Sequence, residues 1–254
     1  MKHLYLLPFA ALICACTGQG GSFGSGTETL DWDSTSLSIE RPIAPDEDLC
    51  YQIKLRIDTL AGESELARQF ASMLRDSVFC VCGPLSIQEA MTAYADSIEA
   101  AWKSDLAEYY EPESEYKDMY QYYYALDGSP VENDNDSVLS YQTTLDCYLG
   151  GAHGSYVVLY YNFDKASGKL LNVEDVVPAE KEMLVLMAMR DQLCEDYQAK
   201  DLAELQEKTG ITMLGDLYLT NNFLLKKDSI AFLFNQYEIA PYASGLIEVT
   251  IPRP

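Results

Sequence analysis

Hydrophobic residues recur at every second position in some parts of the chain and at every third or fourth position in others. The segment 49–60 alternates cleanly, so one of its faces is hydrophobic and the other polar, which is typical of a half-buried strand. The hydrophobic face holds Leu49, Tyr51, Ile53, Leu55 and Ile57. A weaker alternation over 32–42 predicts a strand before it, and from Glu63 onward the spacing becomes helical.

Capping signals and hydrophobic spacing predict two further helices. Ser86 and Glu89 have the S-x-x-E spacing of a capping box, which predicts a helix that begins here and ends by Glu111-Pro112. A long helix is predicted between Pro178 and Gly210, because glycine commonly ends a helix. Its hydrophobic side holds Met183, Leu186, Met187, Leu193, Cys194 and Tyr197.

The remaining strands fall into two groups that flank this last helix. The first group comprises 138–149, 155–163 and 170–173 and is preceded by the β-prone segment 114–126, and the second comprises 217–226, 229–235 and 245–251. The order, β-β-α-α-β-β-β-α-β-β-β, places helices between groups of strands instead of after each one. It therefore predicts an α+β fold of antiparallel sheets packed with amphipathic helices. The acidic, turn-rich segment 127–136 predicts a division between an N-terminal α+β domain, 30–130, and a C-terminal domain, 136–254.

The first residues resemble a bacterial lipoprotein signal. Lys2 precedes an apolar run at 4–13 that suits a secretory signal and is too short to span a bilayer. A small residue directly before Cys16 resembles the lipobox, which predicts a signal peptide at 1–15, a lipid on Cys16 and a Gly/Ser/Thr-rich tether at 16–29. A plain secreted protein cleaved elsewhere is the alternative. We expect an exported protein that is anchored by its lipid in the outer membrane and faces the periplasm.

The composition is that of a globular protein with an acidic surface. Hydrophobic residues make up 48% of the chain, and 40 acidic against 17 basic side chains give a formal charge of −23. Such a surface repels phosphate backbones and anionic lipid, which excludes nucleic acid as a partner and limits membrane contact to the lipid anchor.

Five cysteines follow Cys16, and an odd number leaves at least one thiol unpaired within the chain. They are Cys50, Cys80, Cys82, Cys147 and Cys194. Buried thiols and one or two disulfides both remain possible in an exported protein. Paired CxxC motifs and clustered histidines are absent from the sequence, so no metal and no cofactor is predicted.

The motifs that usually carry catalysis are also absent. The sequence has no G-x-S-x-G elbow beside a histidine and no Gly-rich phosphate loop, and no catalytic residue is assigned. His153 stands in the glycine-rich run 150–154 between two strands. A structural turn in which the imidazole bonds the backbone is the leading interpretation, and a binding contact is the alternative.

Tyrosine is concentrated in the middle of the chain, where 13 of the 19 tyrosines lie between Tyr94 and Tyr161. Tyrosine gives a large rigid contact area with a polar tip and is favoured at recognition surfaces, although it is also an ordinary strand residue. The cluster therefore predicts either an interaction surface or a tyrosine-rich core.

Two separated motifs resemble the RsiV-like family, whose C-terminal part is called domain of unknown function 3298. The first runs from Tyr148 to Gly154 and continues in Asn162-Phe-Asp164 and Gly168-Lys-Leu170; the second runs from Phe234 to Gly245. The resemblance covers about 136–254, and residues of about 30–125 look like the companion domain often found before it. The best-known relative is the extracellular part of an anti-sigma factor that binds lysozyme, and another relative carries this region ahead of a peptidoglycan deacetylase domain.

The resemblance implies binding rather than catalysis for this chain, which has neither a sigma-binding segment nor a deacetylase domain. We expect a non-enzymatic cell-envelope lipoprotein that binds a lysozyme-like muramidase or a peptidoglycan-derived glycan. A carbohydrate-active hydrolase that uses unidentified acidic residues and a structural envelope lipoprotein are the alternatives. Candidate binding residues are His153, Tyr156, Tyr237, Tyr242, Tyr122 and Tyr124.

Overall fold

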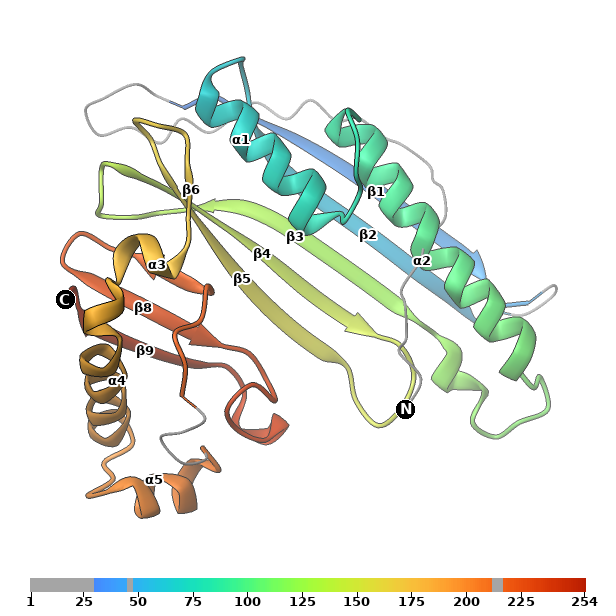
Figure 1. The fold of residues 1–254 in the computed structure, drawn as a ribbon. Helices are drawn as coiled ribbons and strands as arrows, with labels where there is room; N and C mark the ends of the chain where they lie inside the picture. Colours follow the sequence, from blue (N-terminus) through green and yellow to red (C-terminus); the bar gives the residue numbers. More distant parts are fainter. Residues whose placement is uncertain (1–29, 45–47, 212–216) are drawn as a thin grey trace. The chain divides into compact units, whose positions relative to one another are not determined.

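The computed structural model describes residues 30–44, 48–211 and 217–254, and it has two sheets (Figure 1). Strands β1 to β6 hydrogen-bond in chain order in one sheet, and β7, β8 and β9 form the other. Contacts divide the chain into two compact units: the first holds residues up to Ser129 together with Thr144–Ser155, and the second holds Pro130–Thr143 and Tyr156–Pro254. The predicted α+β class is confirmed. The predicted signal peptide, Cys16 and the predicted tether lie outside the described residues.

The first unit contains four strand segments and two helices. They are β1 (Trp32–Pro42), β2 (Cys50–Leu60), α1 (Glu65–Met73), α2 (Ile87–Tyr109), most of β3 (Tyr123–Val131) and the end of β4 (Val138–Tyr148). A π-helical turn, Leu74–Val78, extends α1, and a 3₁₀ turn, Lys117–Tyr120, precedes β3. The capping box of α2 is confirmed, since Ser86 Oγ accepts from the Glu89 N–H and Glu89 accepts from the Ser86 N–H.

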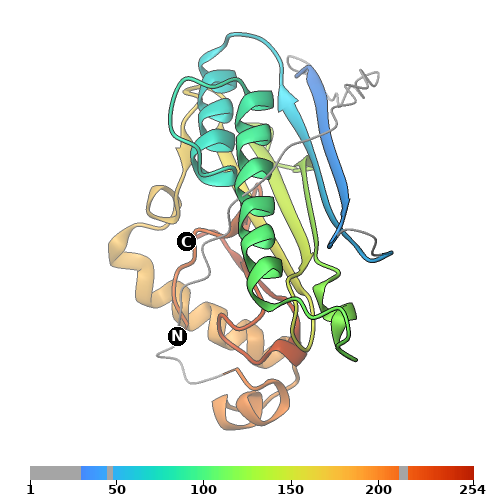
Figure 2. The same cartoon turned by 90° about the vertical axis from the view of Figure 1, so that its right-hand side faces the viewer.

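The two helices of this unit cover one face of its strands (Figures 1 and 2). Alternation along β2 buries Tyr51, Ile53, Leu55 and Ile57 beneath them, as predicted. Phe70 from α1 and Trp102 from α2 are among the buried side chains that complete the core. Each aromatic residue of this size contributes strongly to the stability of the unit through the apolar area that it buries.

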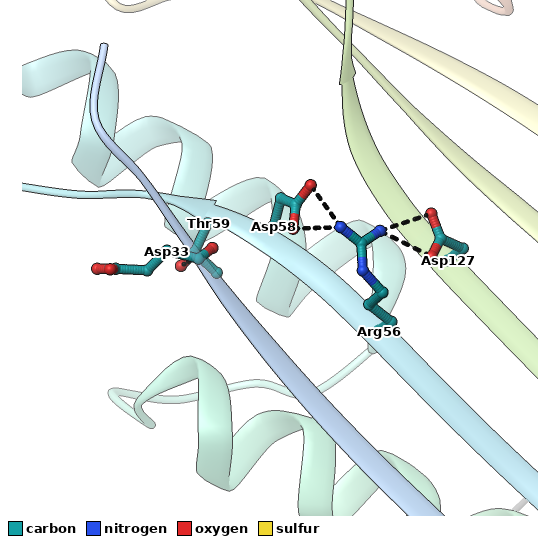
Figure 3. A network of polar contacts seen from close by, with 5 residues as sticks. All are labelled: Asp33, Arg56, Asp58, Thr59 and Asp127. Atoms are coloured by element: carbon teal, nitrogen blue, oxygen red, sulfur yellow. Dashed lines mark hydrogen bonds and ion pairs between the residues drawn. The ribbon is translucent and has the colours of Figure 1, made fainter. Parts of the chain in front are cut away.

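One strand pair differs from the antiparallel expectation, because β2 and β3 are parallel. A parallel pair needs a long crossover connection, and α1 and α2 together supply it. Arg56 on β2 joins the two strands: its guanidinium donates to both oxygens of Asp127 on β3, at 3.1 and 2.9 Å, and to Asp58 (Figure 3). The hydrogen bonds and charge of these two carboxylates raise the pKa of Arg56. In this view the helices lie behind the strands, and Arg56 is exposed on the opposite face of the sheet, since it alternates with the buried residues of β2.

The second unit contains the three-stranded sheet and the C-terminal helices. Its elements are the start of β4, β5 (Ser155–Asp164, from Tyr156), β6 (Leu170–Leu171), α3 (Val173–Val176), α4 (Glu182–Asp196), α5 (Leu202–Thr209), β7 (Phe223–Leu225), β8 (Ser229–Phe234) and β9 (Ile247–Pro252). The hairpin of β5 with β6 is antiparallel, as predicted. Met189 and Leu193 of α4 are buried in one core with Phe223, Phe232 and Val249 of the sheet.

Three predicted elements have different bounds in the structure. The strand predicted at 114–126 begins only at Tyr123, and β7 is confined to Phe223–Leu225. The long helix after Pro178 is two helices, because α4 ends at Asp196 and Asp201 caps a new helix, α5. Val185, Met189 and Leu193 form the buried side of α4, whereas Met183 and Met187 are exposed. Residues 183–189 of α4 are hydrophobic at every position and therefore occupy all sides of the helix, so spacing alone did not identify its buried face. Among the described residues, no helix is both long and apolar enough to cross a bilayer.

Candidate binding pocket

A cavity of about 470 Å³ lies in the first unit, at the C-terminal end of α2. It is lined by Asp105, Tyr109, Glu111, Ser114, Tyr116, Met119, Tyr120, Tyr122, Leu149, Gly150 and Gly151. We call it the acidic pocket. Its volume lies within the range of about 300–1,000 Å³ that is typical of small-ligand sites.

Three neighbouring segments build the acidic pocket. Asp105 and Tyr109 stand four residues apart on α2 and therefore share one side of the helix. The chain turns after Tyr109 and returns along the 3₁₀ turn to Tyr122. Gly150 closes the remaining side with a positive φ of 85°, and a Cβ there would lie 3.4 Å from the Tyr122 ring. The glycine-rich loop that follows β4 thus packs against the pocket wall.

Hydrogen bonds hold the tyrosine walls in place. The Tyr122 hydroxyl donates to Asp105, and the Tyr120 hydroxyl donates to the carbonyl of Tyr109 at 2.8 Å. The rings of Tyr120 and Tyr122 also contact each other, with centroids 6.0 Å apart. A wall fixed in this way loses little conformational entropy when a ligand binds.

The acidic pocket carries a negative field. Burial, the hydrogen bond to Asp105 and the charge of Asp105 raise the pKa of Tyr122. Glu108, and to a smaller extent Asp105, raise the pKa of the exposed Tyr109. Burial is the largest cause of the raised pKa of Tyr122 and the Asp105 carboxylate adds to it, whereas the Glu108 carboxylate is the largest cause for Tyr109. No Lys, Arg or His stands among the described residues that line the cavity, so the same field favours a positively charged ligand.

The sequence-predicted tyrosines of the first unit are both buried. Tyr122 contributes its ring and hydroxyl to the pocket wall. Tyr124 lies in the core, where its hydroxyl bonds that of Tyr94 on α2. His153 is exposed and does not line the pocket; its Nδ1 lies 2.9 Å from the Gly154 carbonyl. This contact matches the turn interpretation of the glycine-rich run.

The other three predicted residues belong to the second unit. Tyr237 is 66% exposed and has a positive φ, and its ring lies 5.7 Å from that of Tyr242. Tyr156 is also exposed, and its backbone N–H donates to Gln236 at 3.5 Å. These residues form a group of their own, separate from the acidic pocket.

Apart from Tyr122, the residues that define the pocket were not identified from the sequence. Asp105, Tyr109, Glu111 and Tyr116 were interpreted as parts of a helix, its end and a strand. A signal was present, because residues 105–118 contain six acidic side chains and one lysine together with three tyrosines. That density of carboxylates and rings would have identified the segment as a candidate site.

The asparagines in the two motifs stabilise the fold. Asn162, in the first motif, donates to the Phe223 carbonyl at 2.7 Å and accepts from the Leu225 N–H at 3.1 Å. Asn235, in the second, accepts from the Val158 N–H at 2.8 Å and donates to the Val158 carbonyl. Each buried amide replaces a pair of strand hydrogen bonds, which satisfies backbone groups that would otherwise be costly to bury.

The described cysteines are all free thiols, with Cys147 buried and Cys80 and Cys82 exposed. Burial raises the pKa of the Cys147 thiol, which makes it less reactive. In the parts of the chain that the structure describes, no three His, Cys, Asp or Glu side chains are grouped to hold a metal ion.

Residues 175–254 match the family described as "Protein of unknown function (DUF3298)". The C-terminal part of the chain is a DUF3298 domain. The second motif, Phe234 to Gly245, lies inside this domain, whereas the first motif precedes it. The RsiV-like resemblance of the whole region 136–254, and the companion domain before it, stay predictions.

Two solved structures of DUF3298 family proteins share the fold of the chain. A member from Bacteroides fragilis NCTC 9343 is 20% identical, with a TM-score of 0.74, and the match covers 88% of this chain and 90% of that one. A DUF3298 family protein from Pseudomonas aeruginosa PAO1 is 18% identical, with a TM-score of 0.58, covering 89% and 91%. None of the curated proteins matches the sequence. At these identities the likeness concerns the fold alone, which extends well beyond the DUF3298 domain.

Proposed function

We propose that this protein binds a cationic side chain of a partner protein in the acidic pocket, and that the partner is a lysozyme-like muramidase. The observation that carries the proposal is a cavity whose described lining combines carboxylates and tyrosine rings without any basic side chain. A cation gains from both components, through charge attraction and through the negative faces of aromatic rings.

An arginine side chain suits the acidic pocket particularly well. Its planar guanidinium can stack on a tyrosine ring and donate several hydrogen bonds to carboxylates at the same time. Asp105 is partly buried and Glu111 is exposed, so the two carboxylates of the lining differ in accessibility. The partly buried Asp105 is expected to contribute more, because solvent screens it less.

A muramidase is the proposed partner for two reasons. Such proteins are cationic, and this chain has a formal charge of −23, which speeds the encounter of opposite charges. The second motif also resembles a family whose best-known relative binds lysozyme. A glycan that carries a carboxylate fits the same pocket less well, because it would meet negative charge and no basic lining residue.

We also propose that the protein is a lipoprotein anchored through Cys16 at the outer membrane, where it would face the periplasm. The lipobox-like sequence and the Gly/Ser/Thr-rich tether support this placement. The tether would let the pocket reach ligands at some distance from the membrane.

The test is binding of the purified protein to immobilised cationic lysozymes by biolayer interferometry at about 150 mM salt, where long-range charge attraction is largely screened. We expect saturable binding that persists when the salt concentration is doubled. The variant that combines Asp105→Asn with Glu111→Gln should bind at least about tenfold more weakly, as expected for the loss of two charge contacts of which one is partly buried.

A matched control removes the same two charges elsewhere. Asp228→Asn combined with Glu207→Gln neutralises two exposed carboxylates of the second unit and should leave binding unchanged. If both double variants lost the same amount of affinity for lysozyme, the interaction would be explained by general charge attraction and not by the acidic pocket. A flat response from the unmodified protein would refute lysozyme as the partner.

A further inference from the structure

Two tyrosines outside the acidic pocket form a pair on the face of the first unit's strands that lies opposite α1 and α2. Tyr124 points toward α2, where it bonds Tyr94, so alternation along β3 places Tyr123 on the opposite face. Tyr148, on the neighbouring strand β4, contributes the second ring. The two ring centroids lie 6.4 Å apart, and the planes are tilted by only 24°. The rings are therefore stacked with nearly parallel planes, and Tyr123 is 37% exposed.

Hydrogen bonds fix both rings. The Tyr123 hydroxyl donates to Asp146 Oδ1 at 2.9 Å, and the Tyr148 hydroxyl donates to the Gly151 carbonyl at 2.9 Å. Gly154 packs so closely that a Cβ there would lie 3.3 Å from the Tyr123 hydroxyl and 2.9 Å from the Cys147 carbonyl. The glycine-rich loop thus holds the pair in one geometry. A preorganised surface of this kind loses little side-chain conformational entropy when a ligand binds.

Polar groups surround the pair. Gln52 on β2 is the register partner of Tyr123. Its Oε1 accepts from Lys54 Nζ at 2.9 Å, and its amide nitrogen carries the two N–H donors of the side chain. Asp146 is exposed, so its carboxylate can accept from a ligand as well as from Tyr123. The site therefore offers an apolar surface flanked by an acceptor, an amide and an ammonium group.

We propose that Tyr123 and Tyr148 form a platform that binds a neutral saccharide through a pyranose ring. A pyranose has an apolar C–H face that can lie on an aromatic ring and a rim of hydroxyls that both donate and accept hydrogen bonds. The platform matches both features. An apolar peptide would take the charges of Asp146 and Lys54 out of water with only the Tyr123 hydroxyl and the Gln52 amide as partners, which is unfavourable. The inference does not rest on the cationic-ligand proposal, since it uses different residues.

Saturation-transfer difference NMR with the whole protein tests the platform, with chitotetraose and cellotetraose as probes at concentrations up to about 10 mM. We expect saturable binding of at least one oligosaccharide. Tyr123→Ala and Tyr148→Ala should each lower the affinity about five- to tenfold, which is the range expected for loss of one aromatic contact. Asp146→Asn, which keeps the shape of the side chain, should lower it about twofold or more, because the carboxylate accepts from the sugar.

Tyr197→Ala is the matched control, because Tyr197 and Tyr123 are both 37% exposed and Tyr197 lies in the second unit. It should leave the affinity unchanged, and circular dichroism would confirm that each variant is folded. If a tyrosine variant fails to fold, Asp146→Asn decides the test in its place. Absence of binding by both oligosaccharides would overturn the proposal, as would equal losses in the platform and Tyr197 variants.

Discussion

Replacement of Gly210 by alanine should destabilise the second unit strongly. Gly210 ends α5 in the left-handed conformation, with φ 73° and ψ 2°, and its N–H donates to the Gln206 carbonyl at 2.8 Å. A Cβ at this position would lie 2.6 Å from Cδ and 2.9 Å from Cγ of Pro241. Pro241 belongs to the second motif, whose Ser244 hydroxyl donates to the carbonyl of Thr209 at 2.5 Å.

Two separate penalties add in the Gly210→Ala variant. A left-handed alanine costs roughly 1–2 kcal/mol relative to glycine. Overlap with the proline ring forces the loop to shift, which costs about 1–3 kcal/mol more, as for other overpacked sites. We therefore expect the free energy of unfolding to fall by about 3 kcal/mol.

Urea unfolding followed by circular dichroism measures this loss, and Pro241→Ala separates its two parts. In the Pro241→Ala background the ring is absent, so Gly210→Ala should cost only the backbone penalty of about 1–2 kcal/mol. The double-mutant cycle should accordingly show a coupling of at least about 1 kcal/mol. A cost below about 1 kcal/mol for Gly210→Ala, or the same cost in both backgrounds, would refute the reasoning.

Two further predictions concern pH and the N-terminus. Burial raises the pKa of the Tyr124 hydroxyl above its ordinary value of 10.0, so above pH 10 the unfolded chain loses this proton while the folded chain keeps it. The free energy of unfolding should therefore fall as the pH rises from 10 to 11, and Tyr124 should contribute a slope of up to about 1.4 kcal/mol per pH unit. Tyr124→Phe should make this decline less steep. An unchanged slope in urea titrations of the variant would contradict the prediction. Cys16→Ser should abolish incorporation of a labelled fatty acid and move the protein from the membrane to the soluble fraction, whereas Cys194→Ser should change neither.

Local patterns were sufficient to predict much of the fold. Alternation located β1 and β2, and the capping box located the start of α2, because both signals depend on residues a few positions apart. The parallel pairing of β2 with β3 could not be predicted in this way. It depends on which strand reaches the free edge of β2, and the Arg56–Asp127 contact that accompanies it joins residues far apart in the sequence.

The candidate sites were harder to predict because of the three consecutive tyrosines, Tyr122, Tyr123 and Tyr124. Without a polar residue among them there is no alternation, so the sequence does not indicate which rings face the core. In the structure the outer two are buried and Tyr123 is exposed. Asp105 resembles any solvent-facing helix carboxylate until the chain after α2 returns and places Tyr122 beside it. The glycine-rich run was identified correctly as a special turn, although its packing against Tyr122 and Tyr123 needed the structure.

The crossover between β2 and β3 also affects the order in which the first unit folds. Arg56 and Asp127 are 71 positions apart, so the chain must close a long loop before β2 and β3 can pair. β1, β2 and α1 lie near one another in the chain and can associate early, whereas the hydrogen-bonding edge of β2 stays open until β3 arrives. During synthesis that edge is a site for unwanted pairing with other chains, and chaperones that hold unfolded strands would protect the nascent protein at this stage.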